Sequence, residues 1–138
     1  MTADLRTLTS NLISPRRVRI LAAALASEFR SPVRAADEAR FVVRRRPLDP
    51  GVIGIYVPPP SAAGRPFLLL DDGTQGADRL AMYTLAIAHY YLGHRALAGY
   101  VYGRSSCALF LDPVAEEEAR VFVSGFRAAG GGGGLTAS

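Results

Sequence analysis

An apolar run from Leu80 to Leu92 constrains the fold of this chain more than any other feature. The run is about thirteen residues long and ends at Gly93-His94-Arg95. A helix that is apolar on all sides is typically buried in a protein core, and a membrane span needs about 20 apolar residues. We therefore expect a buried central helix from about Gly76 to Arg95 and no membrane-spanning segment.

Two further helices are expected before this run. Ser14-Pro15 and Ser31-Pro32 each place a capping hydroxyl before a proline that suits the first helical position. Apolar residues then recur at helical spacing as far as about residue 30. The sequence therefore predicts a long helix from Pro15, followed by a shorter one that continues to Ala39.

Three short runs rich in β-branched and aromatic residues follow the helices. They cover residues 41–43, 52–57 and 67–70, and proline- and glycine-rich turns separate them. Such a small sheet is stable only if one face is covered, which the central helix can do. We expect an α+β fold in which a three-stranded meander packs on the central helix.

The C-terminal part predicts an acidic helix. Asp112-Pro113 is a helix-start pair, and Glu116, Glu117 and Glu118 suit the positive N-terminal end of a helix. The helix should end at the glycine run that starts at residue 130. No linker interrupts the chain, so we expect one domain over residues 1–129 and a disordered glycine-rich tail over residues 130–138.

The charge of the chain is uneven. All 16 basic residues are arginine, and residues 1–69 hold 11 of them against five acidic residues. Clustered cations can bind nucleic acid by releasing the counterions around phosphates, although a solvated basic face is the other interpretation. The candidate basic surface comprises Arg16, Arg17, Arg19, Arg44, Arg45 and Arg46.

The cysteine content and the N-terminus indicate a cytoplasmic setting. Cys107 is the only cysteine, so we expect a packed, reduced thiol and no disulfide within the chain. The first residues include Asp4 and no continuous apolar core before Pro15, which argues against a signal peptide.

Three stretches resemble parts of the ImmA/IrrE-type zinc metallopeptidases. Residues 81–94, which read AMYTLAIAHYYLGH, are similar to the central zinc-binding helix of that family. Residues 51–57 with 66–72 resemble its sheet, and Glu116–Val123 resembles the helix that supplies its third zinc ligand. The resemblance covers about residues 15–128 and implies a zincin-like fold, with His89 at the second histidine and Glu118 as the remaining carboxylate.

The catalytic residues of the family are missing from this chain. Family members need two histidines at positions i and i+4, together with a glutamate beside the first histidine. Those positions are Leu85 and Ala86 here, and neither side chain can bind a metal or accept a proton. The resemblance thus implies an inactive metallopeptidase without a cofactor, in which His89 is hydrogen-bonded to a carboxylate.

A non-standard metal site formed by His89, His94 and a glutamate is the alternative, and only this alternative would require zinc. Five residues turn a helix by about 500°, so the two histidines would point about 140° apart unless the helix ends at Gly93.

Active members of the ImmA/IrrE-type family cleave repressor-like transcription factors. The resemblance therefore implies a protein partner, such as a transcriptional regulator.

Overall fold

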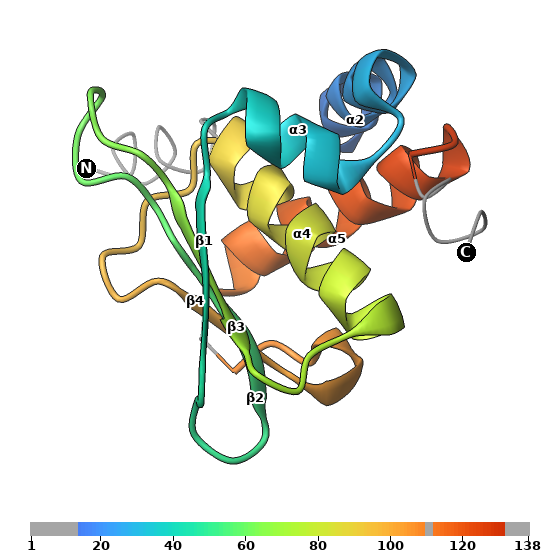
Figure 1. Cartoon of the computed structure of the whole chain (residues 1–138). Coiled ribbons are helices and arrows are strands. Elements are labelled where there is room, and N and C mark those ends of the chain that lie inside the picture. The colour runs from blue at the N-terminus through green and yellow to red at the C-terminus, as the bar shows by residue number, and fades with distance from the viewer. Residues whose placement is uncertain (1–13, 110–111, 132–138) are drawn as a thin grey trace.

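The computed structural model describes residues 14–109 and 112–131 (Figure 1). It confirms an α+β fold. The helices are α2 (Pro15–Phe29), α3 (Pro32–Glu38), α4 (Gly76–Tyr91) and α5 (Pro113–Ala128), and the strands are β1 (Val42–Arg46), β2 (Val52–Val57), β3 (Phe67–Asp71) and β4 (Tyr100–Gly103), with a short 3-10 turn η1 (Arg104–Ser106).

Over the described residues, the sheet has four strands in the order β1-β3-β2-β4. The prediction of a three-stranded meander was therefore wrong. Strand β1 pairs with β3 in parallel, whereas β2 pairs antiparallel with both β3 and β4. The fourth strand is only four residues long and pairs with residues about fifty positions earlier, a contact that no local pattern reveals.

Helix α4 packs on the inner face of the sheet. A Cβ atom at Gly54 of β2 would lie 2.8 Å from Cε of Met82, so glycine at this position lets the helix approach the strand closely. Helix α2 packs against α5, and Figure 1 shows the described helices α2, α3, α4 and α5 on one side of the sheet. The buried side chains of α2, α4, α5 and the sheet form one core cluster.

The outer face of the sheet is apolar and lies opposite the helices. Because side chains alternate along a strand, inward-facing Tyr56 and Leu68 place Ile55, Val57 and Leu69 on the outer face. These outer residues are half-buried and lie outside the core cluster. Phe67, at the start of β3, is 40% exposed on the same face.

The chain ends are only partly described. Gly130 and Gly131 form a turn in which the Gly131 amide donates to the Phe126 carbonyl oxygen at 2.7 Å. The rest of the predicted disordered tail, residues 132–138, lies outside the described residues. Within residues 14–109 and 112–131, no helix combines the length and apolarity needed to cross a bilayer.

Candidate functional site

The site is built around the C-terminal end of α4. The helix ends two residues before Gly93, whose φ of 77° is in the left-handed region that glycine adopts without strain. The Gly93 amide donates to the Tyr90 carbonyl oxygen, and the His94 amide donates to that of His89. This pair of bonds is a Schellman motif, which places the residue after the glycine next to the third-last helical residue.

The motif brings the two histidine rings together. Their Nδ1 atoms lie 2.7 Å apart, and the ring centroids are 5.0 Å apart. Early termination of the helix thus overcomes the divergence that a continuous helix would impose on residues five positions apart.

A continuous chain of hydrogen bonds runs through this pair. At one end, Glu116 Oε1 bonds to the Tyr102 hydroxyl at 2.7 Å, and that hydroxyl lies 2.5 Å from His89 Nε2. At the other end, His94 Nε2 lies 2.6 Å from Glu118 Oε1. The five side chains come from α4, β4, α5 and the turn after α4, so only the tertiary fold assembles them.

Burial and aromatic stacking fix the ring of His89. The side chain is fully buried, and Tyr100 stacks on it with centroids 4.0 Å apart and planes 14° apart. Burial, and then the neighbouring His94, lower the pKa of His89 well below its usual value of 6.5. Within this chain of bonds, His89 is therefore expected to be neutral near pH 7.

The direction of the Tyr102 bond fixes the tautomer of His89. The Tyr102 hydroxyl donates its proton to Glu116 Oε1, so it accepts a bond from Nε2–H of His89. A neutral His89 then carries no proton on Nδ1 and accepts there from Nδ1–H of His94. Burial raises the pKa of Glu116 at this end of the chain of bonds.

The two ends of the hydrogen-bond chain lie in different clefts. Tyr102 and Glu116 line a cleft of about 430 Å³ together with Leu85, Cys107 and Arg120. This cleft is open, and the thiol of Cys107 is exposed, so the prediction that the thiol is packed was wrong.

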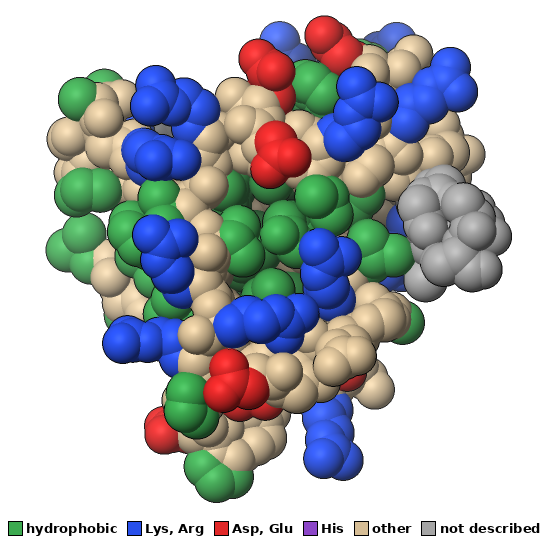
Figure 2. All heavy atoms as spheres, viewed as in Figure 1, with side chains coloured by type: hydrophobic (Ala, Val, Ile, Leu, Met, Phe, Trp, Pro, Cys, Tyr) green, Lys and Arg blue, Asp and Glu red, His purple; other side chains and the backbone are tan. Residues whose placement is uncertain are grey.

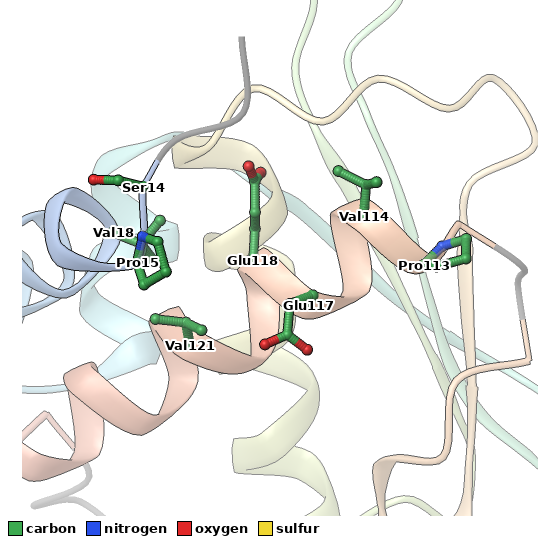
Figure 3. A pocket seen from close by; sticks show the side chains of 8 residues that line it. All are labelled: Ser14, Pro15, Val18, Pro113, Val114, Glu117, Glu118 and Val121. Carbon is green, nitrogen blue, oxygen red and sulfur yellow. The ribbon is translucent and has the colours of Figure 1, made fainter. Parts of the chain in front are cut away.

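His94 and Glu118 line a second cleft, of about 440 Å³, on the other side. Glu118 also borders a largely apolar pocket of about 410 Å³ between the N-terminal ends of α2 and α5. In Figure 3, Glu118 and Val114 project from α5 to the same side, and Pro15 and Val18 of α2 lie beside Glu118.

The four residues matched by resemblance to the family's zinc site lie on two neighbouring helices, α4 and α5. His89, Leu85 and Ala86 are all buried in α4, and Ala86 has no exposed surface. Glu118 bonds to His94, whereas Nε2 of His89 lies 3.9 Å from Glu116 Oε2, which is too far for a hydrogen bond. The expectation of a direct hydrogen bond between His89 and a carboxylate was therefore wrong, because Tyr102 is inserted between them.

The residues present do not fit a catalytic zinc site. A zinc ligand must offer a ring nitrogen to the metal, but both ring nitrogens of His89 are used in bonds to His94 and Tyr102. Among the described residues, no group of three or more His, Cys, Asp or Glu side chains is arranged to hold a metal ion.

The arginines of the predicted basic surface are exposed but divided between two places. Arg16, Arg17 and Arg19 lie on α2, whereas Arg44, Arg45 and Arg46 lie on β1 at the edge of the sheet. Figure 1 shows α2 and β1 well separated, so the structure does not join the two groups. Figure 2 shows blue arginine side chains spread around green hydrophobic ones on the face that it displays. Nucleic-acid binding stays a prediction.

Sequence reasoning missed Tyr102 and considered His94 only as an alternative. Tyr102 was missed because the fourth strand was not predicted, whereas Glu116 lies in the acidic run 116–118 from which one carboxylate was expected to remain. The signal for His94 was Gly93, since a glycine after an apolar helix predicts a left-handed C-terminal cap. Histidines on either side of such a cap can meet.

Comparison of the chain with protein-family models, with curated proteins and with solved structures finds no match.

Proposed function

We propose that this chain is a non-catalytic, protein-binding or regulatory domain on a zincin-like scaffold. The order of helices and strands and the resemblance of residues 81–94 to a zinc-binding helix support the scaffold. Leu85 and Ala86 support the lack of hydrolytic activity, because both are buried apolar side chains at the positions that the chemistry needs.

The closed hydrogen-bond chain at His89 is the observation that carries this proposal. A metallopeptidase must leave its histidine nitrogens available for the metal, and must leave one coordination position open to water. Here both ring nitrogens of His89 are bonded to other side chains of this protein, because His94 occupies the Nδ1 side and Tyr102 the Nε2 side. This arrangement supports a structural role for His89 in place of metal binding.

The proposed partner is another protein. The resemblance suggests a transcriptional regulator, because active members of that family act on such proteins, and it suggests a cytoplasmic setting. The scaffold would then bind its partner without cleaving it.

Metal content and hydrolysis test this proposal. The full chain is purified without a metal-affinity tag, beside His89→Ala, and both are measured by elemental analysis and with a casein hydrolysis assay. We expect well under one zinc per chain in both proteins and no hydrolysis. Zinc near one per chain that disappears in His89→Ala, together with hydrolysis, would show that the domain is an enzyme with a non-standard site.

A further inference from the structure

The outer face of the sheet is an apolar surface that no described helix covers. Its side chains are half-buried, apart from the more exposed Phe67, and they lie opposite α4. They are aliphatic except for one aromatic ring: Val42, Ile55, Val57, Phe67, Leu69 and Val101. An apolar surface of this kind, bordered by charged residues, is typical of an interaction site.

A groove opens at one end of this face. Its volume is about 460 Å³, and it is bounded by the proline run 58–60, Phe67, Leu97 and Arg95. Leu97 is 94% exposed. A leucine this exposed does not stabilise the fold through burial, so it is free to serve as an anchor for a partner.

The charged residues of this face are mainly basic. By strand alternation, Arg44 and Arg46 share the outer face with Val42, and among the described residues neither forms an ion pair. Arg95 lies at the groove. The acid on this face of β3 is Asp71, whose carboxylate already accepts bonds from the amides of Leu48 and Gly73 at 2.9 and 3.0 Å.

We propose that the outer sheet face and its groove bind a segment of a partner protein in which acidic side chains alternate with apolar ones. The apolar side chains would cover Phe67 and Leu97, and the acidic ones would pair with Arg44, Arg46 and Arg95. This inference rests on the proposed protein-binding function and names the surface and the chemistry of the partner.

The size and charge of the face favour such a segment over a second copy of this chain. Four strands about 4.8 Å apart and five residues long give roughly 300 Å². A stable protein dimer buries about 800 Å² on each partner. A second copy would also present arginines to arginines, because Asp71 is already engaged. The scarcity of aromatic side chains argues against single-stranded nucleic acid, which binds by stacking bases on aromatic rings.

Binding of a designed peptide tests the proposal. The probe is a fluorescent 12-residue peptide in which Glu alternates with Leu and Ile, and the control peptide carries Lys in place of each Glu. The full chain should bind the Glu peptide saturably and at least ten times more tightly than the Lys peptide. Amide NMR shifts on binding should map to β2, β3 and the groove.

Matched variants locate the surface. Leu97→Asp, and separately the pair Arg44→Glu and Arg46→Glu, should each weaken binding at least tenfold. The controls are Ile20→Asp, which changes an apolar side chain 58% exposed on α2, and the pair Arg16→Glu and Arg17→Glu. Both controls should leave the affinity within twofold, and circular dichroism should show an unchanged fold in all variants.

Each contrary result has a defined meaning. Equal losses in the control variants, or no saturable binding, overturn the docking surface. Concentration-dependent dimers that Leu97→Asp abolishes would assign the face to a second copy, and tighter binding of single-stranded DNA than of the Glu peptide would assign it to nucleic acid. Cleavage of the bound peptide, detected by mass spectrometry, would overturn the non-catalytic function while leaving the docking surface intact.

Discussion

The Nδ1 atoms of His89 and His94 lie 2.7 Å apart because the helix that carries His89 stops before Gly93. The left-handed conformation at this glycine turns the chain back on itself, and the same turn satisfies the backbone carbonyl oxygens of His89 and Tyr90. One residue thus terminates the helix and closes the polar cluster.

Replacing Gly93 with alanine should cost stability and loosen the histidine pair. An L-residue in the left-handed region costs about 1–2 kcal/mol, so the free energy of unfolding in urea should fall by about that amount. The control is Gly51→Ala, whose φ of 87° is equally demanding and whose Cβ would meet no atom within 4 Å. Both variants should lose stability, but only Gly93→Ala should shift the ring nitrogen NMR signals of His89. Unchanged signals in Gly93→Ala would contradict the role of the turn.

Removal of the Tyr102 hydroxyl should destabilise the fold. This hydroxyl links His89 to Glu116, and its loss leaves the buried Nε2 of His89 without a partner, at a cost of about 1–3 kcal/mol. Tyr56→Phe is the matched control, because Tyr56 is equally buried and its hydroxyl has no hydrogen-bond partner among the described residues. Tyr56→Phe should be neutral or stabilising in urea unfolding. A larger loss in Tyr56→Phe than in Tyr102→Phe would refute the assigned bonds.

Acidification should destabilise the protein through His89. The pKa of this ring is lowered in the folded state, so below about pH 6.5 the unfolded chain binds more protons than the folded one. The contribution of His89 to stability is therefore complete above pH 6.5 and is lost as the pH falls through its folded pKa, with a slope of up to about 1.4 kcal/mol per pH unit.

Glu116 acts in the opposite direction. Its pKa is raised by burial, so its protonated form favours the folded state, and this contribution is lost as the pH rises through the raised pKa. Urea unfolding between pH 5 and 7.5 measures the summed contribution of His89 and Glu116 to the free energy of unfolding. Ring ¹⁵N NMR reports on His89 alone, and this ring should stay neutral at pH 5.5. An imidazolium signal from His89 at that pH would contradict the prediction.

Two substitutions together should create a metal site if the scaffold resembles a zincin. Leu85 is four residues before His89 and lines the same cleft as Glu116. Leu85→His would place two histidines on one helical face next to that carboxylate, and Tyr102→Phe would release Nε2 of His89 for the metal, which gives the minimum set for zinc. We expect about one zinc per chain by elemental analysis of the double variant, abolished by adding Glu116→Gln. No gain of zinc in a folded Leu85→His/Tyr102→Phe protein would weigh against the zincin-like assignment.

Prediction from the sequence was most successful where the signals are local. The capping serines Ser14 and Ser31, each followed by a proline, correctly predicted the starts of α2 and α3. The apolar run correctly predicted the buried helix α4. The expected end of α4 at Arg95 was wrong, since Gly93 ends the helix earlier. The expected strand near residues 41–43 continues to Arg46, because pairing with β3 extends it beyond its apolar part.

The α+β composition, the buried central helix and the apolar residues Leu85 and Ala86 can all be recognised in the amino-acid sequence. They follow from side-chain chemistry and from periods of two and 3.6 residues, which are local properties. The strand order, the fourth strand and the hydrogen-bond chain from Glu116 to Glu118 depend instead on contacts between distant segments. The packing of the whole core around α4 brings those segments together, so no local pattern predicts them.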